Sequence, residues 1–341
     1  MKTLAVVYKR HGAPLEVAEL DTIDLGEPQA DEAIVQIEAS PIHMADLFYM
    51  EGRLPSLAPP PPAIAGIEAC GRIVQIGADG GFEIGDRVFL PRRGGTFSQY
   101  VKVKTAKLTK AVNHGDPVQL SLMPINGATS YVMMTRVVDL KPGEWVLQNA
   151  ANSSCGRFNI RIAKQLGLKT VNVVRREELI PDLLALGADK VLPDGDGLRE
   201  RVSEATGGAK IRYGIDAVAG TATNRMAESL DVGGVLAVYG MMSGQPCSVA
   251  GDLFLTRDLT LRGFCTPFFE VDMPPSERLQ MMSSLANWAA DGQLTAKIAA
   301  TYPLSDFADA MRHEMESGSA RDGKIVILPN PELVASAESA Q

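Results

Sequence analysis

Long hydrophobic runs are missing from this sequence of 341 residues. No stretch reaches the roughly 18 to 20 uninterrupted apolar residues that a membrane-spanning helix needs. The opening segment, MKTLAVVYKRHG, has only a short apolar run before Lys9 and Arg10, and no small-residue cleavage site follows it. We therefore expect a cytoplasmic protein without a signal peptide and without membrane contacts.

Cysteine and concentrated positive charge are also scarce. The four cysteines (Cys70, Cys155, Cys247 and Cys265) are far apart and form no C-x-x-C pair, which argues against a disulfide framework and against a structural zinc site. The formal net charge of -8 is spread along the chain, with no basic stripe and only 6% aromatic residues. We expect a small-molecule substrate and no nucleic-acid partner.

The length of the chain exceeds what one hydrophobic core usually supports, so two domains are expected. Up to about Ser121, short runs rich in β-branched residues alternate with Gly and Pro, which indicates an antiparallel, β-rich domain. The expected strands of this part cover residues 33–37, 71–76, 87–90 and 100–103.

From Lys141 onward, expected strands alternate with helices that end at glycine. The first such unit is a strand at 145–149 and a helix at 156–166 that ends before Gly167. A strand at 170–174, a helix at 179–186 and Gly187 repeat the pattern. Further strands are expected at 190–192, 214–218, 235–239 and 259–262. This alternation predicts an α/β fold with a doubly wound, parallel Rossmann sheet.

After Gly263 the alternation stops, and the sequence predicts helices at 279–290 and 307–316 followed by a terminal strand at 324–328. The end of the chain is thus expected to return to the first domain. We predict a β-rich catalytic domain made of residues 1–122 and 266–341, and a dinucleotide-binding domain made of residues 123–265.

The turn after the first Rossmann strand reads NAANSSCG at residues 149–156, and only Gly156 matches the glycine motif of dinucleotide sites. Such a site needs a tight turn that points backbone N–H groups at a pyrophosphate with little side-chain bulk in the way. Ala151, Ser153 and Ser154 are small, and Asn152 tolerates a positive φ. The turn is compatible with a dinucleotide, although an ordinary turn capped by Ser or Asn has the same composition.

Two arginines follow the second Rossmann strand, where NAD sites usually carry an acidic residue for the ribose. The guanidinium groups of Arg175 and Arg176 suit a 2'-phosphate through charge-assisted hydrogen bonds. A solvated surface pair is the alternative interpretation. Together with the strand and helix pattern, the pair favours NADPH.

Four segments carry a resemblance to a known family: VLQNAANSSCG at 146–156, TVNVVRR at 170–176, VYGMM at 238–242 and LTLRGF at 259–264. They resemble the 2-enoyl thioester reductase branch of the medium-chain dehydrogenase/reductases, which is related to quinone reductases. The resemblance covers nearly the whole chain and implies a GroES-like fold for the β-rich catalytic domain. It also implies a homodimer joined through the strand around residues 259–264.

The resemblance implies cofactor contacts at the positions that match the family's motifs, among them the turn and the arginine pair already described. They are Asn126, Thr129, Asn152, Ser153, Ser154, Cys155, Gly156, Arg175, Arg176, Tyr239, Gly240, Met241, Met242, Phe264, Cys265, Thr266 and Lys324. Two positions depart from the family pattern, because Ser154 and Cys155 stand where Gly and Val are common. Glu177 also changes the order of charges in the arginine cluster.

A catalytic metal is not expected from the residues that match the family's zinc motifs. Zinc-dependent relatives place a Cys in the stretch that matches residues 40–46 and a His in a G-H-E motif. This chain has Pro41 in the first stretch and G-I-E at 66–68 in the second. A tetrahedral site of nitrogen and sulfur ligands is therefore not predicted.

The proton donor is the open question. Enoyl reduction builds negative charge on a carbonyl oxygen, and a proton donor is needed close by. The resembling enzymes assign this role to a Tyr whose place is taken here by Leu54. Tyr49 and His43 are the candidate catalytic residues, with apolar packing as the alternative for Tyr49 and solvent water as a third proton source.

Because that tyrosine is absent, the sequence favours quinones and other activated alkenes as substrates over enoyl thioesters. The main expectation is NADPH-dependent reduction of an activated C=C bond without a metal. An NADPH:quinone reductase is the first alternative. A non-catalytic NADPH-binding protein with a structural or regulatory role is the second.

Overall fold

The computed structural model describes residues 1–78, 81–316, 320 and 322–338. It divides the chain into two compact units. The first unit combines Met1–Ile125 with Leu279–Gln341, and the second consists of Asn126–Arg278. The second unit contains most of the expected cofactor residues.

A six-stranded, fully parallel sheet forms the centre of the second unit, in the order β11-β10-β9-β12-β13-β14. Its strands are β9 (Trp145–Gln148), β10 (Lys169–Val174), β11 (Lys190–Pro193), β12 (Tyr213–Asp216), β13 (Val235–Val238) and β14 (Thr260–Gly263). From β9 the chain runs outward to β11 and then returns to β12 on the other side of β9. This order is that of the Rossmann fold, and β9 and β12 mark the point where ligands bind in such sheets.

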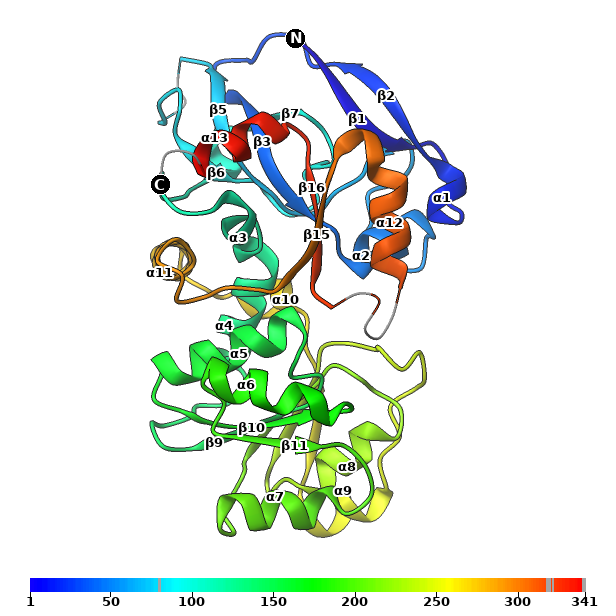
Figure 1. The fold of residues 1–341 in the computed structure, drawn as a ribbon, viewed down its shortest axis with the longest axis vertical. Helices are drawn as coiled ribbons and strands as arrows, with labels where there is room; N and C mark the ends of the chain where they lie inside the picture. The colour runs from blue at the N-terminus through cyan, green and yellow to red at the C-terminus, as the bar shows by residue number, and fades with distance from the viewer. Residues whose placement is uncertain (79–80, 317–319, 321, 339–341) are drawn as a thin grey trace. The chain divides into compact units, whose positions relative to one another are not determined.

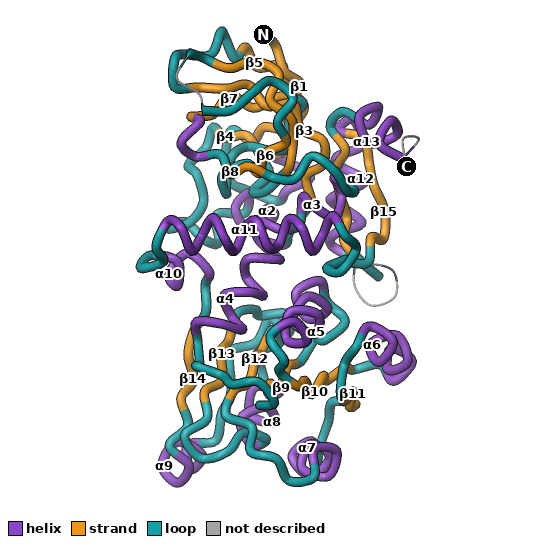
Figure 2. Tube along the Cα trace, turned by 90° about the vertical axis from the view of Figure 1, so that its left-hand side faces the viewer, coloured by secondary structure: helices purple, strands orange, loops and turns teal. Residues whose placement is uncertain are grey.

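Helices cover both faces of this sheet. In Figures 1 and 2, α5 and α6 lie over one face, while α7, α8 and α9 lie over the other. The helices of the unit are α4 (Ala128–Arg136), α5 (Ser154–Gln165), α6 (Ile180–Leu186), α7 (Leu198–Thr206), α8 (Ala222–Glu228), α9 (Gly251–Arg257) and α10 (Thr266–Glu270). The predicted glycine stop is confirmed at the end of α6, where Gly187 has a φ of 110° that favours glycine.

Two apolar clusters attach the helices to the sheet. On one face, Ile160 of α5 and Leu183 of α6 pack with Val174 of β10. On the other face, Val202 of α7 and Met226 of α8 pack with neighbouring strands. Burial of such side chains stabilises the folded chain by about 1.5 to 3 kcal/mol each, which holds the edge of the sheet rigid beneath its loops.

The first unit is rich in β-structure, as predicted. Its strands are β1 (Lys2–Tyr8), β2 (Ala18–Asp24), β3 (Glu32–Pro41), β4 (Ala63–Ile64), β5 (Cys70–Ile76), β6 (Arg87–Phe89), β7 (Tyr100–Lys104), β8 (Thr109–Lys110), β15 (Ile298–Pro303) and β16 (Lys324–Leu328). Its helices are α1 (Pro14–Val17), α2 (Met44–Met50), α3 (Pro117–Ser121), α12 (Phe307–Met315) and α13 (Pro331–Glu338), and most of α11 (Pro275–Ala290) also belongs to it.

Most strand pairs of the first unit are antiparallel, but β15 and β16 run parallel to each other. β15 was not predicted, because its residues are small or only half buried and give no clear alternation. β16 pairs with the end of β3. This pairing brings Lys324 at the start of β16 close to the loop that leads into α2.

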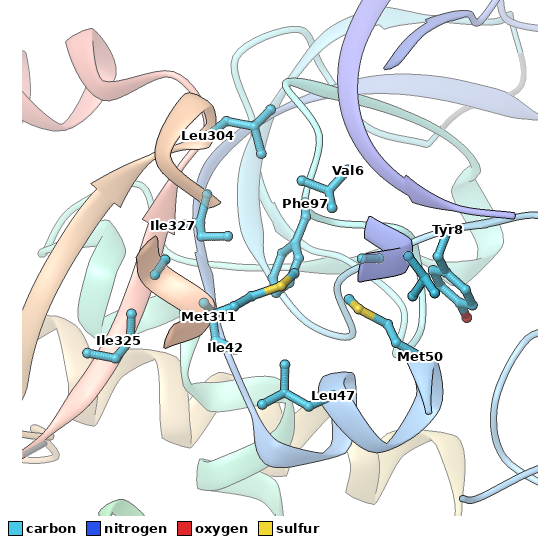
Figure 3. Packing of buried hydrophobic residues seen from close by; sticks show 13 residues of the cluster. Val6, Tyr8, Ile42, Leu47, Met50, Phe97, Leu304, Met311, Ile325 and Ile327 are labelled. Carbon is cyan, nitrogen blue, oxygen red and sulfur yellow. The ribbon is translucent and has the colours of Figure 1, made fainter. Parts of the chain in front are cut away.

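The core beside α2 fixes the position of that helix. Leu47 and Met50 are buried in a cluster with Tyr8, Phe97 and Met311. Figure 3 shows Leu47 and Met50, which belong to α2, with Phe97 and Met311 side by side in the same cluster. The same helix carries Asp46 and Tyr49, so this packing also determines where their polar groups lie.

Candidate functional site

The turn between β9 and α5 is the first part of the expected dinucleotide site. The Ser153 hydroxyl caps α5 by accepting a hydrogen bond from the N–H of Gly156 at 3.1 Å. The residue with positive φ is Ala150, at 47°, and not Asn152 as the sequence suggested. Alanine tolerates this conformation less well than asparagine or glycine, so the surrounding contacts must hold it in place.

Gly156 lets the helix start close to the backbone of this turn. A Cβ atom at this position would lie 2.6 Å from the carbonyl oxygen of Ala151 and 2.7 Å from that of Ala150. Both neighbours are backbone atoms, which cannot move aside without opening the turn. Gly156 therefore has the close-packing role of the last glycine in dinucleotide-binding turns.

A second close approach involves the loop after β13. A Cβ atom on Gly240 would lie 2.6 Å from the carbonyl oxygen of Ala217, which follows β12. Next to it, Tyr239 shares a side-chain hydrogen bond with Ser153, and burial raises the pKa of the Tyr239 phenol. The side chains of Met241 and Met242 are exposed. The loop after β13 thus lies against the turn that begins α5.

Asn149 and Asp216 tie together the ends of β9 and β12. Asn149 donates from Nδ2 to Asp216 at 2.6 Å, and its Oδ1 accepts from the N–H of Ala217 at 2.8 Å. Asp216 is fully buried and also accepts from the hydroxyl of Thr223 at 2.7 Å. This pair was not predicted from the sequence, although polar residues at the ends of neighbouring parallel strands are a signal that indicates such a contact.

The segment that leads into α4 lies against the same turn. Asn126 is buried and donates from Nδ2 to the sulfur of Cys155 at 3.1 Å. Within the described ranges no group donates to its buried Oδ1. The hydroxyls of Thr129 and Thr266 lie 2.8 Å apart. Asn126, Thr129, Cys155 and Thr266 are thus brought together, and the orphan oxygen of Asn126 suits a hydrogen-bond donor on a bound ligand.

The remaining expected residues of this unit lie at neighbouring strand ends. Phe264 is buried at the end of β14, and Cys265 precedes α10 with partial exposure. Arg175 and Arg176 follow β10 directly; Arg175 is exposed, and Arg176 is partly exposed with its Nη1 3.6 Å from Glu178. Two cationic groups at the end of the second strand fit an anionic group on the ribose.

In the first unit, Tyr49 lines a small pocket of about 10 Å³, roughly the space for one water molecule, that is partly open to solvent. Tyr8, Asp46 and Arg93 contribute polar groups to the same pocket. The Tyr8 hydroxyl donates to the carbonyl of Pro59 at 3.2 Å. Burial is the main cause that raises the pKa of Tyr8, and the nearby carboxyl group of Asp46 is the second cause. Tyr49 is half buried and is therefore not part of the fully buried apolar core.

His43 lies at the centre of a buried polar cluster behind that pocket. Its Nε2 contacts Oε1 of Glu68, and its Nδ1 lies 3.5 Å from Nζ of Lys324. Lys324 Nζ also donates to the carbonyl of Ile42. The other Glu68 oxygen accepts from the N–H of Ile125 at 2.7 Å. Both ring nitrogens of His43 are therefore engaged within the protein.

Burial dominates the electrostatics of this cluster. Burial, with Lys324 as the second cause, lowers the pKa of His43 well below its usual value. Burial also raises the pKa of Glu68 to about 8 and that of Asp46 to about 8. The imidazole is thus neutral near pH 7, and the two carboxyl groups hold protons far above the usual carboxyl range.

Glu68 was noted in the sequence only as part of a motif that lacks a zinc ligand, and Tyr8 was not predicted as a site residue. Two signals could have indicated them. Glu68 is a charged residue in the mostly apolar segment before β5, and Tyr8 is a polar residue at the end of the first apolar run. Leu54, in the place of the family's tyrosine, is half buried, and its carbonyl accepts from the N–H groups of Leu57 and Ala58 at 2.9 Å each. Its side chain offers no proton donor.

Within the described part of the chain, no three His, Cys, Asp or Glu side chains are grouped closely enough to hold a metal ion. No helix among the described residues combines the length and the hydrophobicity that a bilayer crossing requires.

A β-rich unit and a unit with a parallel sheet of this strand order together define a two-domain, dinucleotide-dependent oxidoreductase. Comparison with known families supports this class. Residues 29–113 match the alcohol dehydrogenase GroES-like domain, and residues 155–284 match the zinc-binding dehydrogenase family.

Comparison with individual proteins identifies the branch of this class to which the chain is similar in sequence and fold. The chain is 32% identical over 317 residues to the mitochondrial enoyl-[acyl-carrier-protein] reductase of Caenorhabditis elegans, covering 91% of each chain. A protein from Bacillus thuringiensis that carries the name NADPH:quinone reductase is 25% identical, with a TM-score of 0.87 over 96% of this chain and 99% of the other. An enoyl thioester reductase solved with NADP and crotonyl-CoA is 22% identical, with a TM-score of 0.83 over 96% of this chain and 100% of the other.

The chain belongs to the medium-chain dehydrogenase/reductases, in the branch of enoyl and quinone reductases. It is an oxidoreductase, and the predicted combination of a Rossmann unit with a GroES-like unit is confirmed.

Proposed function

We propose that this protein reduces the activated C=C bond of an enoyl thioester or another α,β-unsaturated carbonyl compound with NADPH. The observation that carries the proposal is the turn at the start of α5. There Gly156 allows close backbone packing, Ser153 caps the helix, and Asn126 presents an unpaired buried oxygen. The identity to an enoyl reductase over 91% of both chains supports the same activity.

The residues of the second unit would hold the cofactor as follows. The pyrophosphate would lie at the amino end of α5, where the first-turn N–H groups favour an anion. Arg175 and Arg176 would bind the 2'-phosphate, and the segments around Tyr239 and Phe264 would flank the remaining part of the dinucleotide. When bound, NADPH supplies the hydride. Lys324 belongs to the first unit, and its contact with the cofactor stays a proposal from the family resemblance.

The first unit would supply the acceptor site and the proton. Tyr49 is the candidate we propose to contact an acceptor directly, because this half-buried residue lines a partly open pocket together with Tyr8 and Arg93. Donors aimed at a carbonyl oxygen stabilise the enolate that forms during hydride addition. His43 is the second candidate, and since both of its ring nitrogens have partners, it would act through a neighbouring group.

Reduction of quinones is the alternative activity. Leu54 removes the tyrosine donor of the enoyl reductases, and a quinone depends less on a strong acid because its carbonyl oxygens already stabilise added electrons. The structural neighbour named for NADPH:quinone reductase activity favours this alternative. A non-catalytic, NADPH-binding role is the third possibility, and tight NADPH binding without turnover would support it.

The assembly we propose is a homodimer joined through β14. All four residues of this strand are exposed, and β14 forms an edge of the six-stranded sheet. An exposed strand edge with an apolar residue such as Leu261 is a common site of strand pairing. We also propose that the protein works in the cytoplasm, which cell fractionation would test.

One experiment separates the three activities. Purified protein is incubated with NADPH and, in turn, crotonyl-CoA, a simple cyclic enone and a quinone, and consumption of NADPH is followed. The proposal expects turnover with the thioester or the enone to exceed turnover with the quinone. Preference for the quinone would replace it with the alternative, and binding of NADPH without consumption by any acceptor would leave only the non-catalytic role.

A further inference from the structure

Asp216 is a buried acidic side chain at the carboxyl end of β12 that no step of the proposed reduction uses. It is 0% exposed. Its Oδ1 accepts hydrogen bonds from Nδ2 of Asn149 at 2.6 Å and from the N–H groups of Val218 at 2.8 Å and Ala219 at 3.0 Å. Its Oδ2 accepts from the hydroxyl of Thr223 at 2.7 Å. All four donors are neutral groups, and a fully satisfied buried polar network of this kind makes its surroundings rigid.

The two turns that Asp216 contacts each contain an alanine in the left-handed conformation. Ala150 has a φ of 47° in the turn after β9, and Ala219 has a φ of 63° in the turn after β12. Alanine adopts this conformation only at a cost, because its Cβ atom crowds the following carbonyl oxygen. Such residues persist where surrounding contacts hold them, and they collect at ligand-binding sites. Asn149, which precedes Ala150, and the N–H of Ala219 both donate to the same oxygen of Asp216.

Further hydrogen bonds connect the turn after β12 with the loop after β13. The N–H of Met242 donates to the carbonyl of Ala217 at 3.1 Å. The phenol of Tyr239, at the start of the same loop, shares a hydrogen bond with Ser153, which caps α5. The turn before α5, the turn after β12 and the loop after β13 therefore form one connected set, and Asp216 is its buried anchor.

We propose that Asp216 and Asn149 are positioning residues that set the affinity for NADPH by holding both strained turns in the conformation that binds it. The carboxyl ends of β9 and β12 are the place where ligands bind in a sheet of this strand order. Asp216 is fully buried, so it acts through the backbone groups that it fixes and not through a contact of its own with the cofactor. This inference rests on the proposed function in that NADPH binds at this end of the sheet, and it does not depend on which acceptor is reduced.

Removal of the carboxyl group tests the proposal by titration with NADPH. In Asp216→Ala the N–H groups of Val218 and Ala219 lose their acceptor and the turns relax, so we expect the Kd for NADPH to rise at least about tenfold. Asp216→Asn keeps one oxygen for the same donors, and its amide can donate to the Thr223 hydroxyl. We expect this variant to bind NADPH within about threefold of the wild type, because only the charge of the acceptor is lost. A wild-type Kd in Asp216→Ala, or equal losses in both variants, would overturn the proposal.

The left-handed conformation of Ala219 gives a second test, which a general loss of stability would not pass. Glycine adopts this conformation without the penalty of a Cβ atom. Ala219→Gly, added to Asp216→Ala, should therefore lower the Kd for NADPH several-fold below that of Asp216→Ala alone. Ala250→Gly is the matched control in the same background, because Ala250 has an ordinary φ of -65°. Recovery with both glycines, or with neither, would contradict the role of the strained turn and with it the proposal.

A control at the opposite end of the sheet separates positioning from stability. The carboxyl group of Asp189 also accepts from a backbone N–H and a threonine hydroxyl, those of Thr170 at 2.8 and 3.4 Å, but it lies before β11 at the amino end of the sheet. Asp189→Ala should lower Tm and leave the Kd for NADPH unchanged, whereas Asp216→Ala should change both. An equal rise in Kd for Asp189→Ala would show that any loss of stability weakens NADPH, which would overturn the proposal.

Steady-state kinetics add a readout in which positioning and partial unfolding differ. A positioning role in cofactor binding predicts a raised KM for NADPH in Asp216→Ala, with kcat at saturating NADPH within about twofold of the wild type. A lower kcat with an unchanged KM would indicate a smaller folded fraction and would overturn the proposal. If Asp216→Ala does not fold, Asn149→Ala takes its place and should raise the Kd and the KM in the same way.

The titrations also keep this inference apart from the proposed activity. A wild type that binds NADPH and reduces no acceptor contradicts the proposed activity, and the Kd values of the variants still decide the role of Asp216. A wild type that binds no NADPH contradicts both.

Discussion

Replacement of Gly156 by alanine tests whether the turn before α5 is built for close backbone approach. The added Cβ would lie 2.6 Å from the Ala151 carbonyl oxygen, where ordinary contacts begin at 3.4 Å, so helix and turn must separate by about 0.8 Å. Such overpacking costs about 1 to 3 kcal/mol, and alanine's better helix propensity offsets about 1 kcal/mol of it. We expect the folded state to lose up to about 2 kcal/mol of stability.

The same displacement should weaken NADPH. Hydrogen bonds to charged groups contribute about 1.5 to 3 kcal/mol, so misplacing even one N–H of the turn predicts a Kd for NADPH at least about tenfold higher. Thermal unfolding and fluorescence titration with NADPH measure the two effects. With an unfolding entropy of about 2.1 cal/mol/K per residue, a net loss of about 2 kcal/mol corresponds to a Tm lower by about 3 °C in a chain of 341 residues.

Gly251→Ala is the matched control for this experiment. Gly251 opens α9, and a Cβ atom there would meet no heavy atom within 4 Å. The same substitution in open space should leave NADPH binding at the wild-type value and should leave Tm unchanged or slightly raised. The reasoning is refuted if Gly156→Ala binds NADPH as tightly as the wild type, or if Gly251→Ala shows an equal loss.

Three further predictions concern the cofactor, the acceptor and the assembly. Arg175→Ala should raise the Kd for NADPH by roughly 10- to 100-fold, because one charge-assisted contact is lost, and should change the Kd for NADH by less than about twofold. Equal losses of affinity for both cofactors in titrations would contradict the 2'-phosphate assignment. Tyr49→Phe should lower kcat by roughly 10- to 100-fold in the acceptor assay, and an unchanged kcat would favour water as the proton source. Leu261→Lys should convert a homodimer into monomers by light scattering, and a monomeric wild type would refute the proposed edge.

The architecture of the second unit could largely be predicted because its signals are local. Apolar runs that end at Gly167 and Gly187 mark helix ends, and the strands between them lie within a few residues of their predicted bounds. The order of the strands in the sheet is not a local property of the sequence. It could be predicted only from the general rules for chains in which strands and helices alternate. The contact of Asn149 with Asp216 depends on that order, which is why the pair was missed.

The site in the first unit was harder to predict because its residues meet only in the folded chain. Lys324 reaches His43 through the pairing of β16 with β3, and Glu68 reaches it through the pairing of β5 with the same strand. The positive φ at Ala150 was likewise hidden, since alanine gives no sign of a left-handed conformation. β15 escaped prediction because half-exposed small residues give no hydrophobic period.

The most direct test of the central claim is the transfer of a labelled hydride. NADPH carrying deuterium at the transferable C4 position is mixed with the protein and crotonyl-CoA, and the product is analysed by mass spectrometry. The account predicts a saturated thioester with one deuterium on the β-carbon and the consumption of one NADPH per product. Failure of crotonyl-CoA and of simple enones to consume NADPH, with cofactor binding intact, would contradict it.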